Sequence, residues 1–320
     1  MRLLTPSLLF APLIVLAAPL PLAGQTAPGP LTSPASAAVD SLRARIERRA
    51  AELPGAVIAV AYRDLSPRAG GESFDVNRDS VFHAASTMKV PVMIELVRQS
   101  ESGSLALDQG ILLVNQFGSI VDGSPYSLDP KDDSDSALYA RVGGRVTVRE
   151  LMDRMITRSS NLATNAVIAL VGARRVDSTA HAMGATHIHV LRGVEDGKAF
   201  ERGLNNTTTA PDLATLLAAI ASGSAASPAG TTLMLDVLSR QEFNGEIPAG
   251  LPPGTRVAHK TGQITAVLHD AAIVYPAGRP PYVLVVLTRG IPDEKVARAL
   301  IADVSRMVYE HAVGGGAAGH

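Results

Sequence analysis

Three short motifs constrain the fold of this 320-residue chain more than any other feature. Each pattern occurs once, and in chain order they are S-x-x-K at residues 86–89, S-x-N at residues 159–161 and K-T-G at residues 260–262. The first opens a helical pattern, the second lies between two helical patterns, and the third ends a strand pattern. A site that uses all three therefore needs a fold that brings distant segments to one cleft.

The first motif can supply an activated nucleophile. Serine is a weak nucleophile and needs a base beside it. Residues three apart on a helix are neighbours, so Lys89 is expected one turn after Ser86 and beneath its hydroxyl. A lysine that is desolvated, or close to another cation, can lose its proton and act as that base. Taken alone, the motif also fits a capping serine followed by a surface lysine.

The second motif can supply a proton relay and a hydrogen bond to a substrate. Ser159 can pass a proton to a leaving nitrogen, and Asn161 can bind a substrate amide. Serine and asparagine at this position fit a helix N-cap equally well when the motif is considered alone.

The third motif can supply an anion site. Lys260 and Thr261 can bind a carboxylate, and Gly262 lets a ligand approach the backbone closely. The backbone N–H of Gln263 can be the second donor to an oxyanion. Alone, this segment fits a turn between strands. The three motifs in this order predict a serine acyl-transfer enzyme, for which no cofactor is needed.

Composition excludes several other classes of function. Hydrophobic residues make up 46% of the chain and charged residues 18%, as in a globular protein. The formal net charge of −1 gives no support to nucleic-acid binding. Because there is no cysteine, disulfides, thiolate nucleophiles and cysteine-ligated zinc are excluded.

The N-terminus is typical of a secretory signal peptide. Arg2 precedes an apolar run over residues 3–23, which ends in small residues before a polar stretch. Three prolines within the run weaken the alternative of a retained membrane anchor. We expect a signal peptide over residues 1–24, a flexible leader over residues 25–38, and a periplasmic or secreted protein without stable membrane association after cleavage.

Hydrophobic patterns predict an α+β fold over residues 39–312, followed by a disordered tail at 313–320. Helices are expected at residues 39–53, 86–99, 148–156, 161–171, 176–183, 211–221, 230–238 and 293–311. Strands are expected at residues 55–62, 74–82, 256–260, 265–275 and 282–288. The sheet would be assembled from both ends of the chain, and a helical lobe would occupy residues from about 87 to 250.

An acidic, turn-rich segment covers residues 115–146 and is predicted to be a long surface insertion or rim loop. Its aspartates Asp129, Asp132, Asp133 and Asp135 suggest calcium at first sight. Their spacing lacks the pattern of a calcium loop with a distal glutamate, so we expect a solvated loop.

His187 and His189 form an H-x-H pair that is able to ligate zinc. No carboxylate or further histidine follows at a useful spacing. We therefore expect two histidines at a strand edge and no metal site. A metal hydrolase, the alternative, would lose activity to a chelator.

Four longer stretches resemble class A β-lactamases, with similarity extending over about residues 40–312. They are FHAASTMKVPVMIEL from residue 82, MITRSSNLATN from 155, TTTAPDLATLL from 207 and HKTGQ from 259. The resemblance implies the serine β-lactamase/transpeptidase-like fold, in which an α/β lobe with an antiparallel sheet lies beside an all-α lobe. It also implies a small-molecule β-lactam substrate and a monomer.

The resemblance also implies a glutamate that activates the hydrolytic water. Glu195 is the first candidate, because its spacing after Ser159 is similar to the family's, and Glu201 is the second. Ser160 stands where the family usually has aspartate. The polar segment before Ser159 is longer than usual, which can reshape the rim of the cleft and the range of substrates.

The loop of Glu195 departs from the family's Glu-x-x-Leu-Asn pattern. Ala199 stands in the place of the asparagine that helps to hold the water, unless Asn205 or Asn206 substitutes for it. A general base accelerates a step by about 10²–10⁴, so its loss at deacylation would leave acylation intact and make turnover slow.

The leading hypothesis is a secreted serine β-lactamase that forms an acyl-enzyme on Ser86. Lys89 and Glu195 are the candidate bases, and Ser159 protonates the lactam nitrogen. One alternative is a penicillin-binding, D,D-peptidase-like or esterase-type serine hydrolase that deacylates β-lactams slowly. A non-catalytic binding protein is a third hypothesis, which an intact nucleophile and lysine set disfavours.

Overall fold

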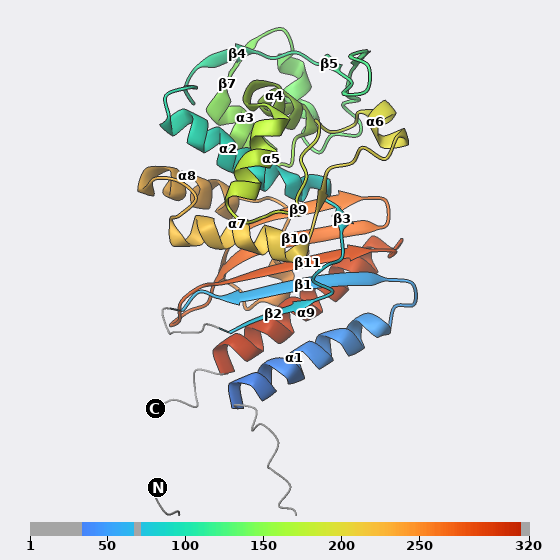
Figure 1. Cartoon of the computed structure of the whole chain (residues 1–320), viewed down its shortest axis with the longest axis vertical. Coiled ribbons are helices and arrows are strands. Elements are labelled where there is room, and N and C mark those ends of the chain that lie inside the picture. Colours follow the sequence, from blue (N-terminus) through green and yellow to red (C-terminus); the bar gives the residue numbers. More distant parts are fainter. Residues whose placement is uncertain (1–33, 67–71, 315–320) are drawn as a thin grey trace, which may run out of the picture. The chain divides into compact units, whose positions relative to one another are not determined.

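The computed structural model describes residues 34–66 and 72–314. The predicted signal peptide, most of the predicted leader and the last residues of the tail lie outside this range. Among the described helices, none is long and apolar enough to cross a membrane. The described chain has a five-stranded antiparallel sheet in the order β2-β1-β11-β10-β9, with helices on both faces (Figure 1).

The sheet combines strands from both ends of the sequence, as predicted. Its strands are β1 Val57–Asp64, β2 Ser73–Val76, β9 Arg256–Ile264, β10 Val267–Tyr275 and β11 Tyr282–Arg289. The helices α1 Pro34–Ala51 and α9 Glu294–Gly314 pack together on one face.

The helical lobe lies on the opposite face of the sheet (Figure 1). Its helices are α2 Lys89–Glu101, α3 Val148–Thr157, α4 Asn161–Val171, α5 Ala173–Ala182, α6 Gly197–Glu201, α7 Ala210–Ser222 and α8 Pro228–Ser239. The shorter elements are β3 Phe82–His83, η1 Ala85–Met88, β4 Gly110–Leu112, β5 Phe117–Gly118, β6 Pro125–Tyr126, η2 Ser136–Arg141, β7 Arg145–Thr147, β8 Thr207–Thr208 and η3 Pro248–Gly250.

Alternation along β1 shows how the sheet separates two hydrophobic cores. Ile58, Val60 and Tyr62 belong to the core beneath α1 and α9. The intervening Ala59 and Ala61 face the larger core, which is shared with the helical lobe. Because both faces are covered, the central strands read as continuous apolar runs rather than as alternating ones. The predicted α+β fold class is confirmed.

Several predicted boundaries are wrong. Helix α1 begins at Pro34, so residues 34–38 of the predicted leader are helical, and α9 extends to Gly314 into the predicted tail. The strand expected at 74–82 is two strands, β2 and β3, separated by a turn with Asn77 at φ 50°. Helix ends and turns are the parts of a fold that periodicity defines least well.

The K-T-G motif lies within β9 and does not end it. Lys260, Thr261 and Gly262 are paired with Ala271, Asp270 and His269 of β10. The strand continues to Ile264, and the two-residue turn that follows contains Ala266 at φ 56°. Gly262 does not break the strand, and β9 forms one edge of the sheet, beside η1.

His269 fixes the sheet to the chain just before η1. Its ring is buried, and burial lowers the pKa of His269 from 6.5 to about 4. The neutral ring has one N–H, which Nε2 donates to the carbonyl of His83 at 2.9 Å. Nδ1 then accepts from the backbone N–H of Thr288 at 3.1 Å. Protonation would turn that acceptor into a second donor, which would lose the Thr288 bond and could donate only to the Leu268 carbonyl at 2.8 Å, in a site where burial disfavours the charge.

We therefore predict that acid destabilises the protein through His269. Folding lowers the pKa of His269, so its neutral form contributes to the free energy of unfolding. This contribution is fully present above about pH 6.5 and is lost as the pH falls toward about 4. The loss attributable to this group is about 3 kcal/mol. His269→Gln should be less stable at pH 7 and should show a correspondingly smaller fall, measured by urea unfolding from pH 7 to pH 4.

The matched control is Leu268→Ala on the same strand, which removes a buried side chain and keeps the histidine. It should lower stability while retaining the wild-type pH slope. An unchanged slope in His269→Gln would show that other groups cause the acid sensitivity.

Candidate active site

The three motifs meet at one cleft of about 810 Å³. Its lining includes Ser86, Ser159, Asn161, Thr261 and Gly262, which come from η1, from the junction of α3 and α4, and from β9. The structure thus brings together segments that the sequence places far apart. Gln263 also lines the cleft, and its side chain is hydrogen-bonded to Glu294 of α9.

Ser86 lies in the short 3-10 turn η1, directly before α2. The turn begins with Ala85 in the left-handed region at φ 46°, a conformation that costs energy for a residue with a Cβ. A Cβ added at Gly262 would lie 3.0 Å from the backbone nitrogens of both Ser86 and Thr87. The close approach of β9 to η1 therefore requires glycine at position 262.

Two buried lysines converge on the hydroxyl of Ser159. Lys89 Nζ lies 3.2 Å from Ser159 Oγ and donates to the Ser159 carbonyl at 2.6 Å. Lys260 Nζ lies 3.0 Å from the same Oγ and donates to the Thr261 carbonyl at 2.8 Å. Both lysine side chains are fully buried.

Burial is the main influence on the charge of this pair. It lowers the pKa of Lys89 to about 7, against the opposing effect of the Asp133 and Glu195 carboxylates. Burial also lowers the pKa of Lys260 well below its usual range, and the neighbouring Lys89 charge adds to the effect. The pair is thus able to hold a neutral amine beside a serine at neutral pH.

The Ser159 hydroxyl lies between the two amines. The Nζ atoms of Lys89 and Lys260 are both within hydrogen-bond distance of its oxygen, which has two lone pairs and one proton. A charged lysine donates to this oxygen, and a neutral one can accept the hydroxyl proton. Ser159 itself is held at φ 56°, in the left-handed region, at the junction of α3 and α4. Strain of this kind persists only where the surroundings fix it.

Asn161 connects the lysine pair to Glu195. Its Oδ1 accepts from Lys89 Nζ at 3.0 Å, and its Nδ2 donates to Glu195 Oε1 at 2.6 Å. Burial raises the pKa of Glu195, and the Asn161 hydrogen bond opposes that shift. Glu201, the second sequence candidate, is an exposed residue at the end of α6. Of the two glutamates, the structure brings Glu195 to the motif residues.

The loop of Glu195 is clamped from α4. The side chain of Asn165 accepts from the N–H of Val194 at 2.6 Å and donates to the Val194 carbonyl at 3.0 Å. A Cβ at Gly193 would lie 2.5 Å from Asn165 Oδ1, so the clamp requires glycine there. Glu195 follows at φ 61°. Asn165 has no local signal in the sequence, because its partner Val194 lies 29 positions later.

Neither Asn205 nor Asn206 is bonded to Glu195. Asn206 Oδ1 accepts from the N–H groups of Leu191 and Arg192, and its Nδ2 donates to the Arg192 carbonyl. Asn205 Oδ1 accepts from the Arg192 guanidinium at 3.2 Å. Both residues therefore stabilise the loop. The prediction that one of them takes the place of the family's asparagine beside Glu195 is wrong.

The acidic segment before Ser159 is more than a solvated rim. Its hairpin of β5 and β6 packs on the Glu195 loop, because Asp196 accepts from Ser119 Oγ and from the Ile120 N–H, both at 2.9 Å. Asp133 and Asp135 are buried, contrary to our expectation. Asp135 forms ion pairs with the guanidinium groups of Arg154 and Arg158.

Asp133 anchors the first turn of α4. Its Oδ2 accepts from the N–H groups of Asn161 and Leu162 at 2.9 and 2.8 Å, and from the Tyr139 hydroxyl at 3.0 Å. The first N–H groups of a helix lack intrahelical partners and favour an anion. Asp133 therefore fixes the helix start that carries Asn161, while Ser160 caps the same helix through Ala163.

We predict that Asp133→Asn lowers the free energy of unfolding by about 1–3 kcal/mol, because two charge-assisted bonds at a buried site lose their anion. It should also slow acylation by displacing Asn161. Urea unfolding and burst kinetics test both effects.

The matched control is Asp129→Asn, an exposed carboxylate of the same segment. It should change stability by no more than about 0.5 kcal/mol. If the two variants were equally stable, Asp133 would not be the residue that anchors the start of α4.

One cationic residue of the cleft was missed from sequence. Arg298 of α9 lines the cleft, but its guanidinium is engaged by Glu246 at 2.7 Å and by Glu294 at 3.2 Å. Burial raises the pKa of Glu246 to about 7. Arg298 is thus already paired with two carboxylates, and Lys260 lies fully buried beside Thr261.

Comparison with known proteins gives this arrangement a family. Residues 41–312 match the model of the β-lactamase enzyme family. A β-lactamase of Amycolatopsis lactamdurans is 28% identical over 286 residues, covering 88% of this chain and 87% of the relative.

Solved structures agree with this result. The β-lactamase from Sphaerobacter thermophilus DSM 20745 superposes with a TM-score of 0.72 at 28% identity, covering 87% of this chain and 97% of the other. A mutant of PBP-A, solved as an acyl-enzyme complex with penicillin G, gives 0.73 at 27% identity, with coverage of 86% and 97%.

The chain therefore belongs to the β-lactamase enzyme family. The resemblance to class A β-lactamases, the serine β-lactamase/transpeptidase-like fold and the assignment to serine hydrolases are confirmed.

Proposed function

We propose that this protein hydrolyses the amide bond of a β-lactam through an acyl-enzyme on Ser86. The observation that carries the proposal is the Ser159 hydroxyl, held between two buried lysines in the cleft that Ser86 lines. A binding protein would have no use for two desolvated amines at a serine, because burying them costs free energy.

Acylation uses all three motifs. Ser86 Oγ attacks the lactam carbonyl and gives its proton to neutral Lys89. The backbone N–H groups of Ser86 and Gln263 hold the oxyanion. When the C–N bond breaks, Ser159 gives its proton to the leaving nitrogen, and the lysine pair restores that proton. The substrate carboxylate binds at Lys260 and Thr261.

Deacylation requires a water molecule activated by Glu195. The carboxylate takes a proton from the water as its oxygen attacks the ester carbonyl, and the proton returns to Ser86 Oγ as the C–O bond breaks. Asn161 orients Glu195 through the 2.6 Å hydrogen bond. The alternative is a penicillin-binding or D,D-peptidase-like enzyme, which the missing asparagine at Ala199 would favour through slow deacylation.

We also propose that the protein is secreted after removal of residues 1–24, which the apolar run and small residues of the N-terminus support, and that it is a monomer, as the resemblance to class A β-lactamases implies. N-terminal sequencing of exported protein decides the cleavage position. Sedimentation decides the oligomeric state.

We expect the acylation rate to fall as the pH drops below about 7. Lys89, whose pKa is lowered to about 7, is protonated below that pH and then accepts no proton from Ser86. The rate should fall about tenfold for each pH unit below the pKa. Stopped-flow acylation by a chromogenic cephalosporin from pH 5 to pH 9 measures this.

The same profile in Glu195→Gln separates the two candidate bases. If the fall in acylation rate below about pH 7 persists in the variant, Lys89 is the acylation base. If the variant no longer shows this fall, Glu195 is the acylation base.

Glu195→Gln should stop hydrolysis after the first step. Replacing the general base is expected to slow deacylation by about 10²–10⁴ while acylation continues. Intact-mass spectra over time in excess benzylpenicillin should show the wild-type protein returning to its free mass and the variant remaining acylated. Glu201→Gln, an exposed glutamate of the adjacent helix, is the matched control and should behave as the wild type.

A persistent adduct on the wild-type protein, with little drug hydrolysed, would overturn the β-lactamase proposal in favour of the penicillin-binding alternative. Absence of any adduct on Glu195→Gln, with turnover unchanged, would remove Glu195 from the mechanism.

A further inference from the structure

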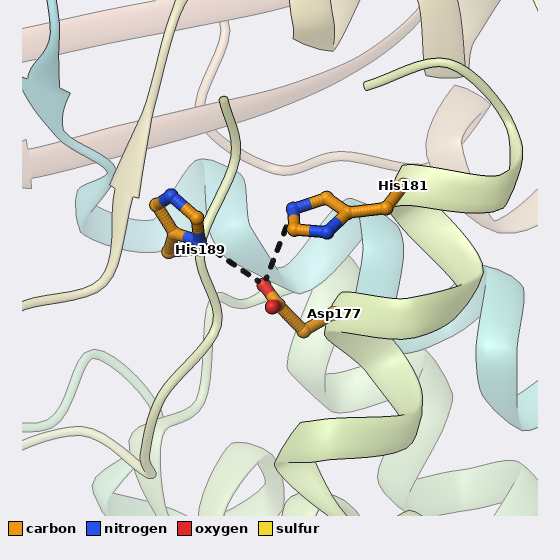
Figure 2. A group of neighbouring side chains, drawn as sticks. All are labelled: Asp177, His181 and His189. Atoms are coloured by element: carbon orange, nitrogen blue, oxygen red, sulfur yellow. Dashed lines mark ion pairs between the residues drawn. The ribbon is translucent and has the colours of Figure 1, made fainter. Parts of the chain in front are cut away.

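A second cluster of titratable side chains lies outside the catalytic cleft. Asp177 and His181 are one turn apart on α5, and His189 lies on the extended segment that precedes the Glu195 loop. Figure 2 shows the Asp177 carboxylate between the two imidazole rings. Asp177 Oδ1 is 3.9 Å from His181 Nε2 and 3.7 Å from His189 Nδ1.

The three residues offer one ligand atom each, and these atoms lie within 4.8 Å of one another. Two imidazoles and one carboxylate match the donor set of three-ligand zinc sites, in which water completes the coordination. The side chains of Asp177, His181 and His189 are 25%, 34% and 48% exposed, so an ion can reach them and keep a water ligand.

Hydrogen bonds already orient the ligands. Asp177 Oδ1 accepts from the backbone N–H of Val190 at 3.0 Å, which leaves Oδ2 available. His181 Nε2, the nitrogen that lies 3.9 Å from Asp177, contacts the carbonyl of Ile188 at 2.8 Å and therefore carries the proton, so a zinc ion would be bound by Nδ1, which keeps its lone pair. A metal-ligating histidine commonly donates its other N–H to a backbone carbonyl in this way.

The backbone of His189 is fixed as well. It exchanges two hydrogen bonds with Thr207, at 2.9 and 3.0 Å, in an isolated bridge. His187, the other member of the H-x-H pair, is 70% exposed and lies beside Asp212 instead. The sequence after His189 offers no further ligand at a useful spacing, whereas the structure supplies Asp177 and His181 from the preceding helix.

We propose that Asp177, His181 and His189 form a zinc-binding site. Zinc at this position would join α5 to the chain immediately before the Glu195 loop. Val190, which already contacts Asp177, is four residues before Val194, the residue that Asn165 clamps. The bound ion therefore stabilises the start of the loop. Its three ligands are different residues from those that carry the proposed reaction.

Calorimetric titration of the chelator-treated protein with zinc chloride tests the site. We expect one saturable ion per chain in the wild type and a loss of affinity of at least about tenfold in His189→Ala and in His181→Ala. His187→Ala is the matched control, because it removes a histidine of the same short segment that lies outside the cluster, and it should bind as the wild type.

Two further readouts report where the ion binds. At zinc one hundred times the Kd, the Tm of the wild type should rise by about 5 °C, and this rise should be absent in His189→Ala. Hydrogen exchange should slow at residues 190–194 when zinc is added. Acylation by benzylpenicillin, measured without zinc, shows that each variant is folded.

Binding by folded His189→Ala with wild-type affinity would overturn the proposal. An equal loss in His187→Ala would also overturn it, by assigning the ion to another group of ligands. A wild type without saturable binding would leave the cluster as a histidine–aspartate contact only.

Discussion

The site depends on one buried contact, in which the Nζ atoms of Lys89 and Lys260 share the hydroxyl of Ser159. Two amines at one oxygen repel each other when both are charged, and neither is hydrated. Such an arrangement exists only where the surrounding fold prevents its relaxation. The helix α2, the α3–α4 junction and the edge strand β9 must therefore each be fixed independently, and the rest of the structure provides these constraints.

Each constraint is a specific polar contact on a rigid element. His269 fixes the sheet to the chain before η1, Gly262 permits the backbone contact between β9 and η1, and Asp133 fixes the start of α4. Carboxylates oppose the repulsion within the pair, since Asp133 and Glu195 act on Lys89, and Asp270 and Glu246 act on Lys260. Asp133 therefore both fixes the start of α4 and acts on the charge of Lys89.

The sequence was sufficient for the parts that local rules determine. Spacing identified Ser86, Lys89, Ser159 and Lys260 as members of one set, and apolar runs identified the long strands and helices. It was insufficient where a residue acts through a distant partner. Asp133 looked like a loop carboxylate because its partners are N–H groups of a helix that begins 28 positions later. The contact of His269 with His83 and the convergence of His189 with Asp177 likewise join residues that are distant in the sequence or on different elements.

The Glu195 loop shows how the protein can depart from the family pattern and still hold a carboxylate beside the motif residues. Where the family has an asparagine within the loop, this chain has Ala199, and the constraint comes from outside the loop instead. Asn165 binds both backbone groups of Val194, and the β5–β6 hairpin binds Asp196 on the other side of Glu195. Fixing both neighbours leaves the carboxylate little freedom, although φ 61° is unfavourable there. A water molecule at Glu195 would thus be positioned by a rigid backbone and by Asn161, so the loss of the family's asparagine need not abolish deacylation.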